Sequence, residues 1–373
     1  MDNPTEKIVT PTLMVDTSKC LSNIDSMWSK ARRSGTSLRP HFKTHQSIEI
    51  GKWFREKGVD GISVSSMDMA VFFAGGGFDD ISVCVPINIR EIDRINGLAR
   101  DIRLNCLVES VEVAGFLSRK LESDLGVFIE IDCGYGRTGV SNADHLMIIE
   151  ILSNLETCPN IDFKGFLTHA GHSYQAESVK QIEQIHLDTV QKMAELKTRF
   201  AVDYPDLIIS IGDTPCCSVA EDLDGIDEAR PGNFVFHDLT QVRLGSCKPQ
   251  QIAVAMACPV IARYPTRGEV VIHGGSVHLG KESLVTRDGS LTYGEVVEFN
   301  SNGWGDPLPG VNVRSLSQEQ GIISGPVDFV RRIHIGDILG ILPVHSCITA
   351  DTAGGYVTLD GQVLDHMRGR SRG

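Results

Sequence analysis

The sequence has few aromatic residues and no long hydrophobic run. Phe, Trp and Tyr make up only 6% of its 373 residues. No window reaches the roughly 18 uninterrupted apolar residues of a membrane span, and the first residues lack the cationic flank and apolar stretch of a signal peptide. An excess of positive charge is also missing, since the net charge is −13. We therefore expect a protein that binds neither membranes nor nucleic acid, both of which select basic surfaces.

The cysteines show no disulfide framework. Ten of them occur in a long chain without a recognisable secretory signal, which favours reduced thiols and a cytoplasmic protein. The composition, 41% hydrophobic and 22% charged, is that of an ordinary globular protein. The length suits a large barrel together with a second unit.

The region from 16 to 240 alternates between helical and strand patterns. Several strands are continuous apolar runs, as expected when both faces of a parallel sheet are buried. The predicted strands are 38–45, 61–66, 80–86, 103–109, 125–132, 163–169, 207–212 and 230–236. Their number and spacing predict an α/β fold with a closed (β/α)₈ TIM-type barrel, and a doubly wound open sheet is the alternative.

After residue 240 the segments become short and β-branched, and Gly, Pro and Asn interrupt them. This pattern predicts a second, β-rich domain over 241–373. The extended residues 1–15 are expected to add a strand to it.

A lysine stands where a barrel core should be apolar. If 38–45 is the first strand, its alternation places His41, Lys43 and His45 on one face. A lysine that is partly desolvated and crowded by imidazoles has a lowered pKa, and it is then a candidate to form a Schiff base with a carbonyl. The alternative is a surface loop of mixed polarity.

Polar residues also follow the later strands at their carboxyl ends, where barrel enzymes place their sites. The turn Gly212-Asp-Thr-Pro215 suits a phosphate, because free backbone N–H groups and a helix dipole favour an anion. A structural N-cap by Thr214, with Pro215 opening the helix, explains the same residues equally well. A Schiff-base lysine and a phosphate-binding turn on one rim together imply pyridoxal 5′-phosphate, PLP.

A second candidate site lies far downstream. In an extended segment His345 and Cys347 would share a face, and imidazole with thiolate suits Zn²⁺. Two protein ligands leave room for water or a substrate oxygen. Coincidence is the alternative, since ten cysteines and twelve histidines produce chance pairs. His273 and His278 flank a Gly-Gly pair, and we expect them in a surface hairpin.

Six motifs between residues 8 and 366 together resemble the D-threonine aldolase and D-serine dehydratase group, metal-activated pyridoxal enzymes with the alanine racemase-like fold. They are Pro40-His-Phe-Lys-Thr-His45, Gly136-Arg-Thr-Gly139, His169-Ala-Gly-His-Ser-Tyr174, Gly212-Asp-Thr-Pro215, Arg230-Pro-Gly-Asn233 and Pro343-Val-His-Ser-Cys347. The resemblance implies fold type III, with a PLP barrel followed by a β domain, and a homodimer. Gln320 and His237 depart from the group, where His and Tyr are common, and this leaves the substrate open.

The resemblance also implies residue roles. Lys43 would carry the cofactor, and His345 and Cys347 would bind the metal, which is zinc in relatives with this pair and Mn²⁺ or Mg²⁺ in some with a carboxylate. The candidate sets are catalytic Lys43, Tyr174 and His169, and cofactor-binding Lys43, Arg137, Tyr174, Gly212, Asp213, Thr214 and His41. We expect a PLP- and metal-dependent lyase acting on a β-hydroxy D-amino acid. The alternatives are an amino-acid racemase of the same fold and a non-catalytic PLP-binding protein.

Overall fold

The computed structural model describes residues 5–286 and 289–369. The chain folds into two compact units. The barrel unit comprises residues 25–43 and 51–232, and the β-rich unit comprises residues 1–24, 44–50 and 233–373. Within the described ranges, every helix is too short or too polar to cross a bilayer.

Eight parallel strands form one continuous sheet in the barrel unit. Their spatial order is β2-β10-β9-β8-β6-β5-β4-β3, and a parallel bridge between His41 and Ser63 joins the chain after β2 to β3. The sheet is therefore closed into a ring, which confirms the predicted barrel. The strands are β2 (Ser37–Leu38), β3 (Ile62–Val64), β4 (Asp80–Pro86), β5 (Arg103–Val108), β6 (Leu125–Asp132), β8 (Ile161–Thr168), β9 (Ile208–Ile211) and β10 (Glu228–Ala229), with β7 (Val140–Ser141) beside β6.

The first strand of the ring ends earlier than predicted, and the last strand, β10, ends before the predicted range 230–236 begins. Proline follows each of them, at Pro40 and Pro231, and proline cannot donate to a strand ladder. The chain then forms 3₁₀ turns at Phe42–Thr44 and Asn233–Val235. The alternation proposed for 38–45 is therefore wrong from residue 42 onward.

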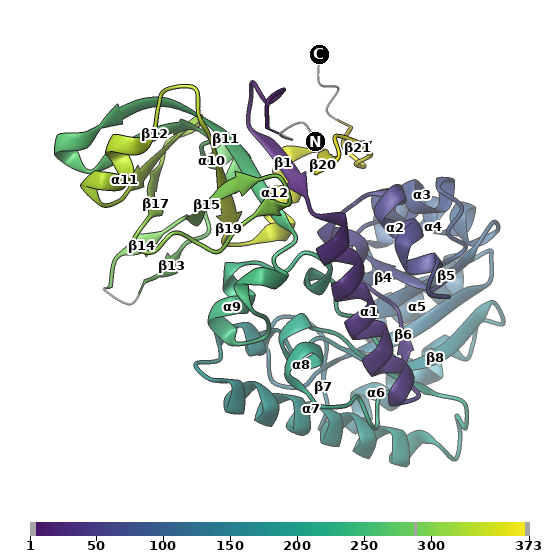
Figure 1. Ribbon diagram of the computed structural model, residues 1–373. Coiled ribbons are helices and arrows are strands. Elements are labelled where there is room, and N and C mark those ends of the chain that lie inside the picture. The colour runs from purple at the N-terminus through teal and green to yellow at the C-terminus, as the bar shows by residue number, and fades with distance from the viewer. Residues whose placement is uncertain (1–4, 287–288, 370–373) are drawn as a thin grey trace. The chain divides into compact units, whose positions relative to one another are not determined.

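Helices alternate with the barrel strands along the chain and lie outside them in Figure 1. Several begin at a Ser or Asp side chain that accepts a backbone N–H from the first turn, which satisfies one of the unpaired donors there. The helices are α1 (Thr17–Arg33), α2 (Ile48–Arg55), α3 (Met67–Gly75), α4 (Ile92–Ala99), α5 (Val111–Lys120), α6 (His145–Leu155), α7 (Val179–Phe200) and α8 (Thr214–Val219).

The β-rich unit contains a second closed ring, made of mostly antiparallel pairs. Its strands are β11 (Val254–Tyr264), β12 (Glu269–His273), β18 (Gln320–Ser324), β17 (Asn312–Leu316), β15 (Gly294–Asn300) and β19 (Ile338–Pro343). β1 (Thr12–Val15) pairs with β11, so the N-terminal residues add a strand to this unit. β20 (Tyr356–Thr358) and β21 (Val363–Leu364) continue from it, β16 (Gly303–Trp304) pairs with β15, and β13 (Leu284–Val285) pairs with β14 (Leu291–Thr292).

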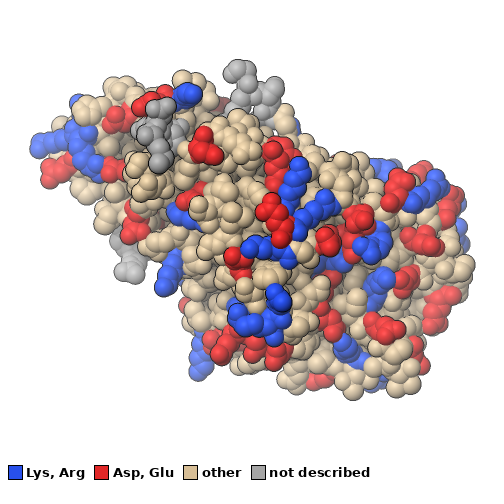
Figure 2. Space-filling model, turned by 45° about the vertical axis from the view of Figure 1, so that its right-hand side comes forward, with Lys and Arg blue, Asp and Glu red and all other residues tan. Residues whose placement is uncertain are grey.

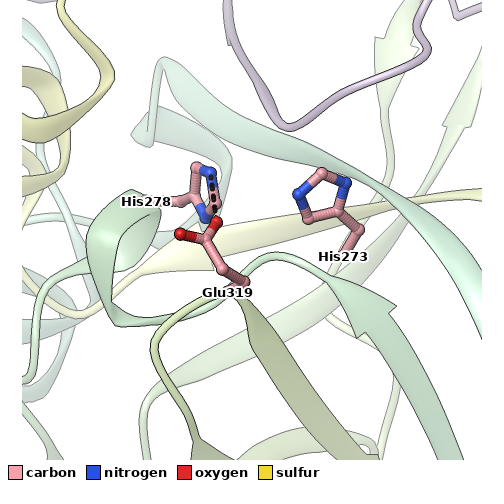
Figure 3. Close-up of side chains that lie close together, drawn as sticks. All are labelled: His273, His278 and Glu319. Atoms are coloured by element: carbon pink, nitrogen blue, oxygen red, sulfur yellow. Dashed lines mark ion pairs between the residues drawn. The ribbon is translucent and has the colours of Figure 1, made fainter.

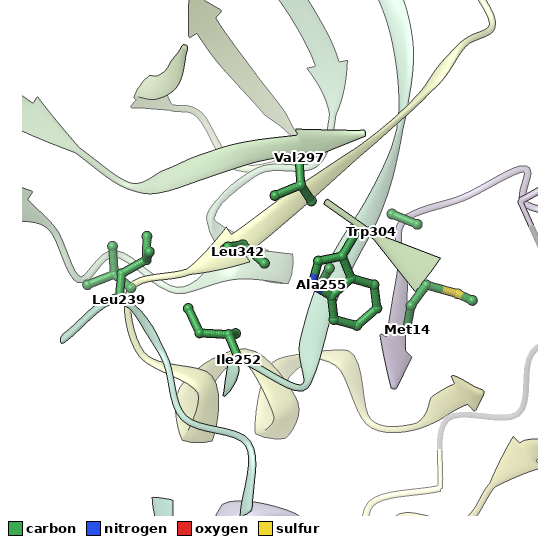
Figure 4. Packing of buried hydrophobic residues seen from close by; sticks show 9 residues of the cluster. Met14, Leu239, Ile252, Ala255, Val297, Trp304 and Leu342 are labelled. Carbon is green, nitrogen blue, oxygen red and sulfur yellow. The ribbon is translucent and has the colours of Figure 1, made fainter. Parts of the chain in front are cut away.

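Four short helices complete this unit: α9 (Leu239–Leu244), α10 (Ser276–Leu279), α11 (Val327–Arg332) and α12 (Ser346–Ala353). Its core joins β1, α9 and the ring (Figure 4). Met14, Leu239, Trp304 and Leu342 are all buried in one cluster. Truncating such a leucine to alanine typically costs about 2–5 kcal/mol, so this packing fixes β19, which leads directly into α12.

Charged side chains of both signs are interspersed on the face shown in Figure 2, with no large area of one sign.

Candidate active site

Lys43 lies just beyond the first barrel strand. His41, two residues earlier, pairs with Ser63, and its Nδ1 accepts the backbone N–H of Lys43 at 3.3 Å. Lys43 is exposed, so the predicted desolvation is absent in the chain alone. His45 belongs to the β-rich unit, where it is buried and its Nδ1 accepts the N–H of Ser47. The predicted row of imidazole, amine and imidazole on one strand face is therefore wrong.

His169 follows β8 and is held in one tautomer. Its Nδ1 is hydrogen-bonded to the carbonyl of Gly212, so Nδ1 carries the proton and Nε2 has a free lone pair. Burial, with the positive charge of Lys43 adding to its effect, lowers the pKa of His169 to about 3. The structure thus brings His169 near Lys43 and keeps it neutral, as a proton acceptor.

Aromatic rings surround His169. The ring of Tyr174, in the 3₁₀ turn Gly171–Gln175, lies 6.4 Å from that of His169, and the ring of Tyr135 lies 6.0 Å away. His172 stacks on Tyr135 at 6.4 Å. A Cβ at Gly171 would come within 2.4 Å of the Tyr135 ring, so this contact requires glycine. The sequence did not single out Tyr135 and His172 as site residues, although Tyr135 directly precedes the motif Gly136–Gly139 and His172 lies inside the motif His169–Tyr174.

The loop after β6 is shaped by Asp132. Its carboxylate accepts the backbone N–H groups of Gly134, Tyr135 and Gly136 at 2.8–3.1 Å. Partial burial raises the pKa of Asp132, but these hydrogen bonds outweigh it and leave the pKa lowered. The loop therefore presents Arg137 as an exposed side chain, with its guanidinium 5.2 Å from the Tyr135 ring.

The turn after β9 is capped by Asp213, and not by Thr214. Asp213 accepts the N–H of Cys216 at 2.7 Å and the hydroxyl of Ser173 at 3.0 Å, and burial raises its pKa to about 6. Thr214 is 1% exposed, and its Oγ1 has no hydrogen-bond partner among the described residues. The N-cap is therefore Asp213, where the sequence suggested Thr214. The Thr214 hydroxyl is consequently available to bind a ligand.

The metal candidates belong to the β-rich unit. His345 is the N-cap of α12 and Cys347 lies in its first turn, so the predicted extended segment is wrong. The two side chains are nevertheless hydrogen-bonded to each other. Burial lowers the pKa of His345, but Cys347, Asp238 and Glu282 outweigh it and raise the pKa to about 9. The pair sits in a region of negative charge that suits a divalent cation.

A buried polar network supports Cys347. The amide nitrogen of Asn233 donates to the Cys347 sulfur at 3.6 Å and to Asp238 at 2.7 Å. Asp238 also accepts the backbone N–H of Ser346 at 3.0 Å. The Cys347 thiol donates to the hydroxyl of Thr44, the residue that follows Lys43 in the chain, at 3.3 Å. These groups fix the sulfur from several sides, as outer partners of metal ligands do.

Three further polar residues have structural environments that the structure defines directly. Asp351, in α12, accepts from Gln46 at 2.9 Å and pairs with Arg368 at 3.0 Å. His237 has a φ of 51°, and burial lowers its pKa to about 4. Gln320 is exposed in β18.

Two family descriptions match the chain. Residues 15–239 match "Alanine racemase, N-terminal domain", and residues 253–359 match "Putative serine dehydratase domain". The chain belongs to the alanine racemase N-terminal domain family. Within this family of PLP enzymes it has the barrel and the C-terminal domain of the D-serine dehydratases, which confirms the resemblance drawn from the six motifs.

Two relatives that match over 95% or more of both chains are dehydratases. A D-serine dehydratase of Dictyostelium discoideum is 29% identical, with 96% of both chains covered. The D-threo-3-hydroxyaspartate dehydratase of Delftia sp. is 29% identical over 95% of both chains, and its solved structure has a TM-score of 0.91 with 99% of this chain and 100% of that chain covered. Two variants of that enzyme have also been solved, one with a histidine and one with a cysteine replaced by alanine, and the cysteine variant is in a metal-free form.

Proposed function

We propose that this protein is a D-amino acid dehydratase that uses PLP on Lys43 and a divalent metal on His345 and Cys347 to remove water from a β-hydroxy D-amino acid. The single observation that carries the proposal is that both domains match the family models. The lysine that the chemistry requires, Lys43, is present after the first barrel strand. A lyase acting on β-hydroxy D-amino acids is the activity of the relatives that match end to end.

The barrel unit fits PLP. The unpaired, buried hydroxyl of Thr214 offers a donor for the phosphate, beside Gly212, where a Cβ would come within 2.9 Å of Arg230. PLP supplies an electron sink for a negative charge at the substrate α-carbon. Lys43 would hold the cofactor, and its Nζ would take the α-proton once the substrate amine had displaced it from the cofactor. His169, neutral and with Nε2 unprotonated, is a second proton acceptor on the same rim.

The remaining candidates take supporting roles in this proposal. Tyr174 and Arg137 would line the cofactor, and His41 would orient the backbone at Lys43 through the bond to its N–H. Asp213 would act through the turn that it caps, because its side chain already binds Cys216 and Ser173.

The β-rich unit fits a metal. His345 and Cys347 provide the nitrogen and sulfur that zinc favours over harder ions. The histidine and cysteine replaced in the two solved Delftia variants are separated by one residue, the same spacing as His345 and Cys347. A metal held there would act as a Lewis acid on the substrate β-hydroxyl. We propose zinc, since the second ligand is a thiolate.

The same site residues would also suit retro-aldol cleavage, the reaction of D-threonine aldolases. Elimination is favoured by the thiolate ligand at Cys347 and by the two dehydratases that match over 95% or more of the chain. A racemase would not need the metal ligands His345 and Cys347, and a non-catalytic PLP-binding protein would not need the second domain.

We further propose a cytoplasmic homodimer with a D-amino acid as its small-molecule substrate. None of the ten cysteines, all of which lie in the described ranges, forms a disulfide and seven are buried, as expected in a reducing compartment. Sedimentation velocity tests the dimer directly.

Product analysis tests the function. The purified protein is incubated with D-serine, D-threonine and D-threo-3-hydroxyaspartate, with and without a chelator. We expect a keto acid and ammonia, formed only while the metal is present. Glycine and an aldehyde would establish the aldolase instead, and L-amino acid formed with the chelator present would establish the racemase.

A further inference from the structure

Three side chains of metal-ligand type meet in the β-rich unit outside the site described above (Figure 3). His273 ends β12, His278 lies in α10, and Glu319 lies in the turn before β18. Each offers one ligand atom, and these atoms lie within 4.8 Å of one another. The structure corrects the predicted surface hairpin, because α10 follows the Gly-Gly pair.

We propose that His273, His278 and Glu319 form a second cation site, with a preference for zinc. Two nitrogens and one carboxylate oxygen are a ligand set that zinc uses when water fills the fourth position. His278 Nε2 and Glu319 Oε2 are 3.9 Å apart, too far for a hydrogen bond. Two ligands of one tetrahedral zinc, with bonds of about 2.0–2.2 Å, lie roughly 3.3–3.6 Å apart, so a small rotation of the exposed Glu319 completes the site. The proposal does not depend on the proposed function.

The backbone holds the three ligands in place. Gly274 donates to the carbonyl of Glu319 at 3.0 Å, and Ser276 donates to that of Ser317 at 2.8 Å. His273 pairs with Gln320 across β12 and β18. A Cβ on Gly275 would come within 2.3 Å of the Gln318 carbonyl oxygen, so the close approach of the two segments requires glycine. The geometry is thus set without the ion, which lowers the cost of binding it.

One hydrogen bond opposes the ion. His278 Nδ1 accepts the N–H of Gly275 at 3.2 Å, so in the metal-free chain the ring proton is on Nε2. Binding through Nε2 moves that proton to Nδ1 and breaks the bond to Gly275, which weakens metal binding. Metal-bound histidines normally donate from their other nitrogen. We therefore expect this site to release its metal to a chelator more readily than the site at Cys347.

The second site would brace the first. Thr349 and Thr352, in α12, donate to the carbonyls of Leu279 and His278 in α10, at 3.0 and 3.1 Å. α12 also carries Cys347. An ion bound at His278 would restrain α10 and, through these two bonds, the helix that positions the thiolate.

Metal counting on the full-length protein tests the proposal. Cys347→Ala removes the thiolate ligand of the first site, and zinc is measured after equilibrium dialysis. We expect about one equivalent to remain, and to be lost in Cys347→Ala combined with either His273→Gln or Glu319→Gln. His334→Gln is the matched control, because His334 is an exposed histidine of the same unit, paired with Asp337 at 3.7 Å, and it should leave the zinc in place. Residual zinc that survives both cluster substitutions, or none bound in Cys347→Ala alone, would overturn the proposal.

The absorption spectrum of bound Co²⁺ distinguishes metal at the second site from metal at the Cys347 site. Co²⁺ bound by a thiolate gives a charge-transfer band, whereas Co²⁺ bound by imidazole and carboxylate gives only d–d bands. In Cys347→Ala we expect the d–d bands without the charge-transfer band, and the cluster substitutions should remove them. If the unsubstituted protein lacks the charge-transfer band, the metal role of Cys347 fails while the second site stands. Because Glu319 is exposed, Glu319→Gln should leave the fold intact, so loss of metal in this variant would not result from unfolding.

Discussion

Replacing Thr214 by valine should change stability and cofactor affinity in opposite directions. The Thr214 hydroxyl is buried and has no hydrogen-bond partner among the described residues. A buried polar group without a partner costs about 1–3 kcal/mol. Valine has the same shape without the hydroxyl, so Thr214→Val should stabilise the PLP-free protein by about that amount.

The same substitution should weaken PLP binding. A hydrogen bond to a charged group contributes about 1.5–3 kcal/mol, which corresponds to roughly a 10- to 150-fold increase in the Kd of PLP. The cofactor is removed with hydroxylamine, stability is measured by urea unfolding, and PLP is titrated back by its absorbance. Thr214→Ser, which keeps the hydroxyl, should retain most of the affinity.

Thr189→Val is the matched control. Thr189 is equally buried and belongs to the same unit, but its hydroxyl donates to the Ile185 carbonyl at 2.7 Å. Its removal should lower stability slightly and leave PLP binding unchanged. An unchanged Kd in Thr214→Val, or a loss of stability matching that of Thr189→Val, would refute the assignment of Thr214 as a phosphate donor.

Three further predictions follow from the site. Lys43→Ala should lose the absorbance band of bound PLP, and borohydride reduction with peptide mapping should place the label on Lys43; label on another lysine would exclude the assignment. A chelator, or Cys347→Ala, should abolish lyase turnover and leave the PLP spectrum nearly intact, whereas Cys347→Asp should keep some activity and shift preference toward Mn²⁺; full turnover of the chelated enzyme would make the pair structural. Burial raises the pKa of Asp213 from 3.8 to about 6, so the folded PLP-free chain holds this proton more tightly than the unfolded chain does. The free energy of unfolding should therefore fall by about 3 kcal/mol as the pH rises from below 3.8 to above 6. Asp213→Asn should remove this part of the pH dependence in urea unfolding, and an unchanged difference in stability between pH 4 and pH 6.5 would count against the shift.

The barrel is predictable from the sequence because its strands are buried on both faces. Continuous apolar runs such as 80–86 and 125–132 form β4 and β6 with the predicted bounds. The errors fall where proline stands near the strand ends, at Pro40 and Pro231. The prediction extends the strand alternation past Pro40 and so places Lys43 on a strand face. Proline interrupts the strand pairing there, and Lys43 lies in a 3₁₀ turn instead.

The pair His345 and Cys347 is predicted correctly as neighbours but for an incorrect reason. Strand alternation would put them on one face, but the residues meet because one caps α12 and the other stands in its first turn. Spacing alone does not distinguish these geometries. Thr44 and Asn233 could not be predicted as partners of Cys347, because they come from distant segments that only the fold brings together.

Three of the buried atoms that lack partners in the barrel unit lie near the rim where PLP is proposed to bind. Glu130 Oε2, His172 Nδ1 and Thr214 Oγ1 are buried and have no hydrogen-bond partner among the described residues. Glu130 lies near the carboxyl end of β6, and His172 and Thr214 follow β8 and β9, which are neighbouring strands of the same sheet. Native proteins pair nearly all buried polar atoms, so three unpaired ones on one rim are a cost that packing does not explain. A polar ligand bound at that rim would offset it, and PLP brings both the phosphate and the ring nitrogen that such donors and acceptors require.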